Sequence, residues 1–389
     1  MVKAVKNGRI ISPDGVKDGV LVIADGKISE VAGSVPAGSE VVDAEGCYVS
    51  AGFIDIHTHG AGGADFMDGT VDAYLKAARM HAVHGTTLLY PTTLTSTNEL
   101  LYESFETYRK AVVENVDGAA FGGMHLEGPY FNPLFAGAQD SRYLRTPRPE
   151  EYMEILDRCP DLARWSFAPE LEGAGEFSAE LSRRGIVASI GHTNATFSEC
   201  DAAWKAGASH MTHFYSCMST VTRRNAYRIA GTVEYGYWQD GMTVEVIADG
   251  IHVPADLLRL LLKIKGMERI ALVTDSMRSA GMPEGPSILG GLSDGQQVIV
   301  EDGVAKLMDR TAFAGSVATA DRCVRTMVEL AGCSVPEAVM MMTLNPARIM
   351  GISDRKGSVA PGKDADLVIF DDGINVRKTI IGGKIIFEI

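Results

Sequence analysis

The stretch Gly52–Gly60, GFIDIHTHG, places two histidines two residues apart at the end of an apolar run. Successive side chains of a β-strand alternate between its two faces, so His57 and His59 are predicted to project together, with Asp55 behind them. Two imidazoles on one face at a strand end can bind a metal ion. They could equally be two unrelated histidines, and the rest of the chain must distinguish these interpretations.

Seven further segments also read as short strands, and helical patterns lie between most of them. The eight predicted strands are FIDIHT from Phe53, TTLLYPTT from Thr86, FGGMHLEG from Phe121, RWSFAPE from Arg164, GIVASIGHT from Gly185, SHMTHFY from Ser209, TVEVIADG from Thr243 and IALVTDS from Ile270. Among the helices, one is expected from near Thr70 to Gly85, and another is expected to open at the capping box Ser96-x-x-Glu99. Repeated strand–helix order predicts an α/β fold, a (β/α)8 TIM-like barrel with its active site at the C-terminal strand ends.

Both ends of the chain read differently from this middle. The first part alternates β-branched residues with Asp-Gly turns, and the last part carries Asp-Asp-Gly and Gly-Gly turns. We therefore predict one small β-sandwich domain built from residues 1–51 and 352–389, attached to a barrel formed by residues 52–351.

Composition restricts the partners of the protein. The 389 residues include 36 Lys and Arg against 50 Asp and Glu, a net charge of −14, which disfavours nucleic acid and anionic membranes. No run approaches the ~20 apolar residues of a membrane span. The six cysteines are scattered without a C-x-x-C pair, which favours reduced thiols and a cytoplasmic location. Any anion must be held locally, by a few arginines or backbone N–H groups.

Metal-ligand side chains recur at the predicted strand ends. They are His57, His59, Glu127, His192, His213, His252 and Asp275. Each alone has a structural explanation, because a strand-end histidine is more often simply hydrogen-bonded and an aspartate can cap a helix. Their convergence from six strands on one mouth favours a metal site. For His81, His84 and His210 we favour a structural role, while His125 could be either structural or a support for Glu127.

The ligand types indicate the chemistry. Imidazole and carboxylate ligands suit Zn, Fe, Mn or Co, and one or two divalent ions can be accommodated. With two, His57, His59 and Asp275 would surround one ion, His192 and His213 the other, and Glu127 would bridge them. Such a centre supplies hydroxide near neutral pH and polarises a carbonyl, while Asp275 acts as acid and base. The pattern predicts hydrolysis of an amide or related C–N bond.

The motifs also resemble the N-acetylglucosamine-6-phosphate deacetylases of the amidohydrolase superfamily. The similar segments are GFIDIHTHG, HLEGPYFNP, GAQD, GHTNAT, THFYSCMS, IADGIHV, VTDSMRSAGMPEG, FAGS, TLNPARIMG and KGSVAPGKDADLVIF, and they span almost the whole chain. Many binuclear members bridge their metals with a carboxylated lysine on strand 4. RWSFAPE has no lysine, and the resemblance implies that Glu127 takes this position instead.

The resemblance implies roles by position. His192, His213 and Glu127 would hold the main metal, Asp275 would be the catalytic acid and base, and His252 would hydrogen-bond the acetyl carbonyl. Substrate contacts would fall on Ala138, Gln139, Ser216, Cys217, Arg224, Asp249, His252, Phe313, Ala314 and Gly315. The expected reaction releases acetate from N-acetylglucosamine 6-phosphate, a small amino-sugar phosphate, and similar proteins suggest a homodimer.

The segment 216–231 departs from the family pattern. Asn-Ala-Met followed by Arg-Glu-Pro-Gly is usual, whereas this chain has SCM and then TRRNAYRIAG. Arg224 aligns best with the phosphate-binding arginine, but Arg223 or Arg228 could serve, and the cluster could be only a solvated basic turn. The alternatives are a deacylase for another N-acyl amino sugar, its phosphate or an N-acyl amino acid, or a non-catalytic scaffold barrel. The scaffold would be signalled by lost ligands, and none is lost.

Overall fold

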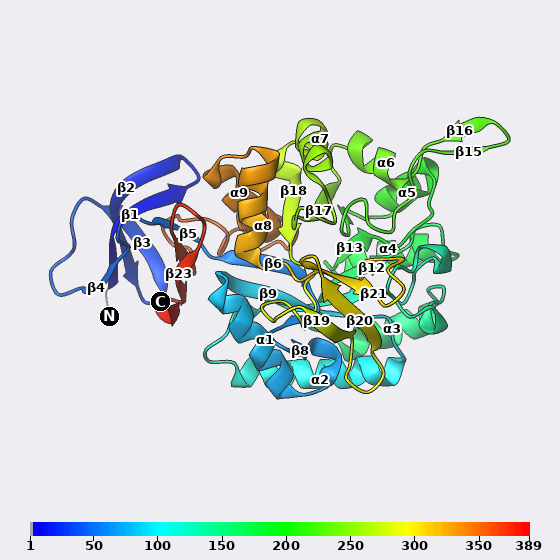
Figure 1. The fold of residues 1–389 in the computed structure, drawn as a ribbon, viewed down its shortest axis with the longest axis horizontal. Helices are drawn as coiled ribbons and strands as arrows, with labels where there is room; N and C mark the ends of the chain where they lie inside the picture. The colour runs from blue at the N-terminus through cyan, green and yellow to red at the C-terminus, as the bar shows by residue number, and fades with distance from the viewer. Residues whose placement is uncertain (1–2) are drawn as a thin grey trace.

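The computed structural model describes residues 3–389, which form a large barrel and a smaller sheet beside it (Figure 1). All eight predicted barrel strands are present, the third as two short pieces. The barrel strands are β6 (Phe53–Thr58), β9 (Thr86–Thr93), β10 (Ala120–Phe121), β11 (Met124–Glu127), β12 (Leu162–Phe167), β13 (Val187–Ile190), β14 (His210–Met211), β17 (Thr243–Ile247) and β18 (Ile270–Val273).

Every barrel strand runs parallel to its neighbours. The order is β10-β9-β11-β12-β13-β14-β17-β18, and β6 pairs with β9 at the other side. The seam between β6 and β18 is held where the Asp275 N–H donates to the His57 carbonyl at 2.9 Å. The (β/α)8 prediction is confirmed, and parallel order places all strand C-termini at one mouth.

Helices cover the outside of the barrel. They are α1 (Val71–Val83), α2 (Asn98–Glu114), α3 (Pro149–Arg158), α4 (Ala174–Arg183), α5 (Phe197–Lys205), α6 (Thr232–Trp238), α7 (Ala255–Lys265), α8 (Ala320–Thr326), α9 (Val335–Met342) and α10 (Leu344–Ile349). The expected helix after Thr70 is confirmed, with the Thr70 hydroxyl accepting from the Ala73 N–H. The predicted start at Ser96 is wrong by one residue. The cap is Thr97, whose hydroxyl accepts from the Leu100 N–H, and Ser96 stays in the extended chain before it.

The two chain ends share one sheet. Its strands are β1 (Lys3–Ser12), β2 (Gly15–Ala24), β3 (Lys27–Ala32), β4 (Glu40–Asp43), β5 (Tyr48–Ala51), β22 (Leu367–Phe370), β23 (Val376–Ile381) and β24 (Lys384–Glu388). Strand β1 pairs with β4 near its start and with β5 near its end, so the sheet bends around a shared apolar core with residues from both ends of the chain. The small β domain is thus confirmed, while the boundaries at 51 and 352 stay a prediction.

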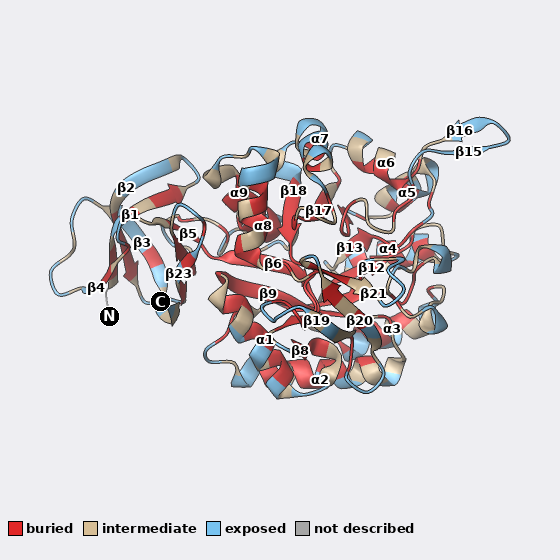
Figure 2. Cartoon of the chain, viewed as in Figure 1, coloured by how far each residue is buried: buried red, intermediate tan, exposed pale blue. Residues whose placement is uncertain are grey.

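The interior of the barrel is unusually polar for this fold. Along β12 the alternating residues Trp165 and Phe167 join the apolar layer under the helices, and Arg164 and Ser166 point into a hydrogen-bonded interior. Barrels of this type normally fill that space with branched apolar side chains. Figure 2 shows the barrel strands as mostly buried, and both of these polar side chains lie away from solvent.

Several small elements decorate the barrel. They are β7 (Gly60–Ala61), β8 (Ala64–Asp65), the hairpin β15 (Thr222–Arg224) and β16 (Tyr227–Ile229), the sheet β19 (Gly285–Leu289), β20 (Gln296–Glu301) and β21 (Val304–Leu307), the 3-10 turns Phe66–Asp68, Pro133–Phe135, Ser141–Tyr143 and Met267–Arg269, and a π-helical turn at Met327–Ala331. The hairpin extends away from the body of the molecule (Figure 1). Among residues 3–389, no helix combines the length and apolar character needed to cross a membrane.

Candidate active site

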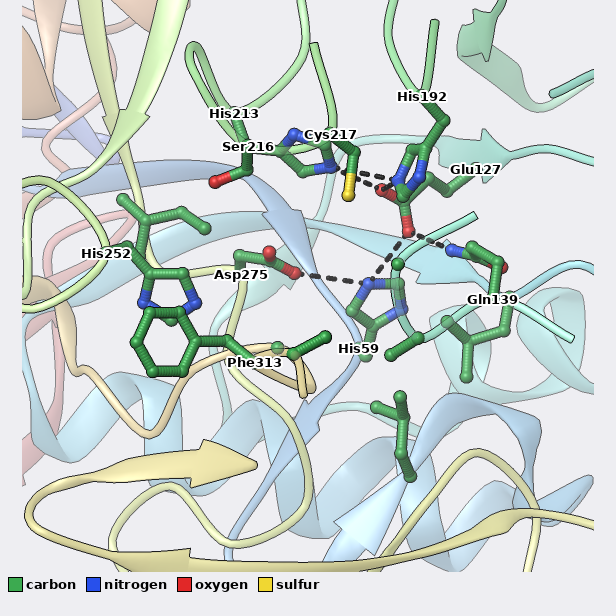
Figure 3. A pocket seen from close by; sticks show the side chains of 17 residues that line it. His59, Glu127, Gln139, His192, His213, Ser216, Cys217, His252, Asp275 and Phe313 are labelled. Carbon is green, nitrogen blue, oxygen red and sulfur yellow. Dashed lines mark hydrogen bonds and ion pairs between the residues drawn. The ribbon is translucent and has the colours of Figure 1, made fainter. Parts of the chain in front are cut away.

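Glu127 lies at the centre of the barrel mouth, between two groups of ligand-type side chains (Figure 3). On one side, its Oε1 lies 3.1 Å from His192 Nε2 and 3.0 Å from His213 Nε2. On the other side, its Oε2 lies 3.2 Å from His59 Nε2. One carboxylate therefore contacts histidines from both groups.

Asp275 completes the second group. Its Oδ1 lies 3.2 Å from His59 Nε2 and 3.4 Å from His57 Nε2. The ligand atoms of His57, His59 and Asp275 all lie within 4.8 Å of one another, as do those of Glu127, His192 and His213. The structure thus brings together all six predicted metal ligands, and in the division predicted from the sequence.

The backbone at this mouth is strained. His192, His213 and Asp275 have φ of 48°, 28° and 47°, in the left-handed region that side-chain-bearing residues rarely adopt. Such conformations cost on the order of 1–3 kcal/mol each and cluster at functional sites. Here they turn each side chain sharply inward just after its strand ends.

Hydrogen bonds behind the rings fix which nitrogen faces the centre. Nδ1 of His59 lies 3.2 Å from the Thr92 carbonyl, and Nδ1 of His192 lies 2.9 Å from the Phe135 carbonyl. Both carbonyls can only accept, so Nδ1 carries the hydrogen and Nε2 presents a lone pair. His57 Nε2 is buried and has no hydrogen-bond partner. This set of inward nitrogens and carboxylates is suited to a divalent cation.

The electrostatics support the same conclusion. Burial opposes protonation of His57, but nearby carboxylates, Asp275 foremost, outweigh it and raise its pKa to about 9. Burial is likewise outweighed at His59, where hydrogen bonds to Asp275 and Glu127 raise the pKa to about 10. Burial also opposes ionisation of Glu127, yet the surrounding imidazoles hold its pKa well below the usual range. The negative charges of Glu127 and Asp275 favour a positive charge between them, which a bound metal ion would supply.

A cavity of about 190 Å³ opens above these ligands. Of the predicted substrate contacts, those that line it are Ala138, Gln139, Ser216, Cys217, His252, Phe313 and Gly315. Gln139 Nε2 donates to Glu127 Oε2 at 2.6 Å, so this side chain also orients the central carboxylate. Ala314 is fully buried next to the lining and does not reach the cavity surface.

His252 is held from behind by Asp249. Its Nδ1 lies 2.7 Å from Asp249 Oδ2, while Asp249 Oδ1 accepts the backbone N–H groups of Ile251 and His252, each at 2.8 Å. The ring packs against Phe313 with centroids 4.6 Å apart. Asp249 therefore acts here through His252 and does not itself line the cavity.

Arg224 lies elsewhere. It is exposed on the hairpin β15–β16 and is absent from the cavity lining. Arg223 pairs directly with Arg228 across the hairpin, and Arg224 pairs with Tyr227, so Arg224 points to the opposite face from the other two arginines. The three arginines that the sequence left open as phosphate contacts thus lie on two faces of the hairpin, Arg224 on one and Arg223 with Arg228 on the other.

The remaining histidines have local partners. His81 Nε2 contacts the Thr58 hydroxyl at 2.9 Å, His84 contacts Asp321, and His210 contacts Thr243 and Glu245. His125 contacts Thr92 and Ser166, and its ring meets the edge of the His57 ring with centroids 4.7 Å apart. His125 therefore contacts one of the candidate metal ligands, His57.

Sequence reasoning missed two buried charges below the mouth. Arg164 and Glu245 are both 0% exposed and form an ion pair inside the barrel. The signal was present, because each is a single charged residue in an otherwise uncharged strand segment, RWSF and TVEVI. What the sequence could not provide was that the two strands direct these charges at each other.

Comparison with known proteins gives a consistent result. The model of the amidohydrolase family matches residues 48–386. The N-acetylglucosamine-6-phosphate deacetylase of Bacillus subtilis is 36% identical, over 96% of this chain and 93% of its own. The N-acetylgalactosamine-6-phosphate deacetylase of Escherichia coli is 33% identical, over 99% of each. A crystal structure of N-acetylglucosamine-6-phosphate deacetylase from Pasteurella multocida superposes with a TM-score of 0.92 at 28% identity, covering 99% of both chains.

Proposed function

The chain belongs to the amidohydrolase family, and we propose that it hydrolyses N-acetylglucosamine 6-phosphate to glucosamine 6-phosphate and acetate. The observation that carries the proposal is the Glu127 carboxylate, which contacts both groups of ligand-type side chains under one cavity. The choice of substrate is supported by the similar Bacillus subtilis deacetylase, 36% identical over 96% of this chain.

His57, His59 and Asp275 would hold one divalent ion, and Glu127, His192 and His213 the other. The nitrogen and oxygen ligands suit Zn, Fe, Mn or Co. Ions bound there would polarise the acetyl carbonyl and lower the pKa of water. The buried carboxylates that face these histidines and the unpartnered His57 Nε2 support this assignment.

Asp275 is the proposed acid and base. Burial opposes its ionisation, but His57 and His59 outweigh burial and lower its pKa, so it is a carboxylate able to take a proton. It accepts the proton of the attacking water and then delivers it to the amide nitrogen as the C–N bond breaks. Acetate leaves as one product and the amino-sugar phosphate as the other.

His252 is the proposed contact of the acetyl carbonyl. Asp249 Oδ2 lies 2.7 Å from Nδ1 of His252 and fixes the ring, which leaves Nε2 as the nitrogen available to contact the carbonyl. The other proposed substrate contacts are Ala138, Gln139, Ser216, Cys217 and the segment from Phe313 through Ala314 to Gly315. All of these except Ala314 line the cavity, where they would surround the sugar and keep the reacting amide above the ligands.

Arg224 is the proposed phosphate contact, and its position suggests how it reaches the phosphate. The hairpin extends from the barrel (Figure 1), and Tyr227 on it is 79% exposed. An extended ribbon with an exposed aromatic side chain is suited to packing on another molecule. We propose a cytoplasmic homodimer in which each hairpin brings Arg224 to the cavity of the second copy.

The galacto epimer is a second candidate substrate. It is favoured by the 33% identity to the Escherichia coli N-acetylgalactosamine-6-phosphate deacetylase. The test is acetate release by metal-loaded protein from both sugar phosphates, from unphosphorylated N-acetylglucosamine and from an N-acetyl amino acid. Turnover of N-acetylglucosamine 6-phosphate at least tenfold above the other three supports the proposal. Preference for the galacto epimer, the free sugar or the amino acid contradicts it.

A further inference from the structure

A charged network that the proposed reaction does not use lies directly below the metal ligands. Arg164 and Glu245 form an ion pair there, both side chains 0% exposed. Burying two charges is costly, and a pair of matched apolar residues is often as stable or more stable. A buried pair at this position therefore calls for an explanation other than stability.

Glu245 contacts residues from both ligand groups. Its Oε1 lies 2.7 Å from His57 Nδ1 and accepts the backbone N–H of His213 at 2.9 Å. Its Oε2 is held by Arg164 and lies 3.3 Å from His210 Nε2. One carboxylate thus bonds the ring of one ligand and the strained backbone of another.

The contact determines how the His57 ring is used. A carboxylate flanked by a guanidinium accepts a hydrogen bond, so Nδ1 of His57 carries the hydrogen. The lone pair is then on Nε2, which is buried, has no partner and lies 3.4 Å from Asp275 Oδ1.

Arg164 in turn fixes Glu245. Its Nη1 donates to the Ile56 carbonyl at 3.1 Å, and its Nη2 donates to the hydroxyls of Ser189 and Thr212 at 3.2 and 3.0 Å. These bonds anchor the guanidinium to β6, to β13 and to the residue that follows β14. The Glu245 carboxylate cannot rotate away from His57 without leaving the Arg164 guanidinium unpaired.

We propose that Glu245, held by Arg164, is a positioning residue that prepares His57 for the metal ion shared with His59 and Asp275. The inference rests on the proposed metal centre. It predicts unequal effects, because Glu245 contacts the ring of His57 but only the backbone N–H of His213, and the His192 ring has its own acceptor, the Phe135 carbonyl. Loss of a carboxylate behind a ligating histidine typically weakens metal affinity 10- to 100-fold.

The test is calorimetric titration of metal-free protein with Co²⁺, using two double variants. Arg164→Met/Glu245→Leu removes both charges and the acceptor, whereas Arg164→Met/Glu245→Gln removes both charges but keeps an oxygen that can accept from His57. Melting temperatures of the metal-free proteins are measured in parallel. Ser166→Ala is the matched control. Ser166 belongs to the same buried network, but its side chain bonds His125 and Thr212 and neither Glu245 nor His57.

We expect the wild type to bind two Co²⁺ ions. In the leucine variant one of them should bind about 10- to 100-fold more weakly and the other within about threefold of wild type. The glutamine variant should recover most of the lost affinity, and the control should bind as the wild type does. Melting temperatures that are equal in the two double variants would separate positioning from general destabilisation.

Three results would overturn the inference: equal weakening of both ions, no weakening in the leucine variant, or failure of glutamine to restore affinity. A wild type that binds one Co²⁺ but hydrolyses the substrate would also overturn it while leaving the proposed function in place. A wild type that binds no Co²⁺ would contradict the proposed function itself.

Discussion

The metal half of the site and its phosphate half are built in different ways. The metal ligands end parallel strands, are at most 6% exposed and are held by further buried groups such as Thr92, Gln139 and Glu245. Arg224 is exposed on a two-stranded hairpin outside the barrel. The proposed chemistry therefore lies in the rigid part of the fold, whereas the proposed phosphate contact lies on a segment that the barrel does not constrain.

Metal removal should have the largest effect on activity, because the proposed ions in the buried metal half polarise the carbonyl and activate the water. A strong chelator should abolish acetate release, and added Co²⁺ or Zn²⁺ should restore it. The chelated protein should also melt earlier, since a ligand at 100 times its Kd stabilises the folded state by about 2.7 kcal/mol. Activity that survives complete removal, verified by elemental analysis, would disprove the proposed chemistry.

Asp275→Asn should come next. Asparagine keeps the size of the side chain but cannot take up the proton, and general acid–base catalysis contributes about 10²- to 10⁴-fold. We expect kcat to fall by that factor with little change in KM, measured by acetate release at matched metal content. A fall of less than tenfold would assign proton transfer to another group.

Arg224→Ala should have a smaller effect and act mainly on KM. A charge-assisted hydrogen bond contributes about 1.5–3 kcal/mol, which corresponds to about a 10- to 100-fold rise in KM for the sugar phosphate. Arg223→Ala is the control on the opposite face of the hairpin and should leave KM within about threefold. Equal effects of the two variants would indicate a diffuse basic surface and not a specific contact.

Mixing the two impaired variants would show which copy supplies the arginine. Arg224→Ala and Asp275→Asn chains refolded together in equal amounts form mixed dimers as half of all dimers. If Arg224 acts on the second copy, each mixed dimer has one intact site of two, so the mixture should show about a quarter of the wild-type activity. If Arg224 acts within its own chain, mixing should restore nothing. Subunit exchange can be verified with differently tagged chains.

Thr70→Ala should have the smallest effect on the site. It removes the N-cap of α1, where the Thr70 hydroxyl accepts from Ala73, and such losses cost about 1 kcal/mol. Urea unfolding should show this loss, while kcat and KM stay unchanged. A change in kcat would mean that the metal half is less insulated from the helix layer than its burial implies.

The barrel and the gathering of the candidate metal ligands could be predicted from the sequence because both depend on local patterns. A strand and the ligand at its end are encoded in the same few residues, as in FIDIHTH or MHLE. Parallel β/α order then brings the ends together without further information. The convergence of the candidate ligands at one mouth follows from that order.

Other features depend on contacts between distant segments and could not be predicted. Arg164 and Glu245 meet only because β12 and β17 direct them into the same interior. The position of Arg224 depends on where the hairpin points, which no local pattern specifies. The sequence pattern does not predict the sheet β19–β21. It predicts the cap of α2 at Ser96, although the cap is Thr97, because both hydroxyls precede the helix.

The most direct test is a crystal structure of the metal-loaded protein with anomalous data collected at the absorption edge of the metal. We expect two anomalous peaks about 3.5–4 Å apart, one among His57, His59 and Asp275, the other beside His192 and His213, with Glu127 between them. A single peak, or a Glu127 carboxylate turned away from both, would contradict the two-metal centre proposed for the mouth of the barrel.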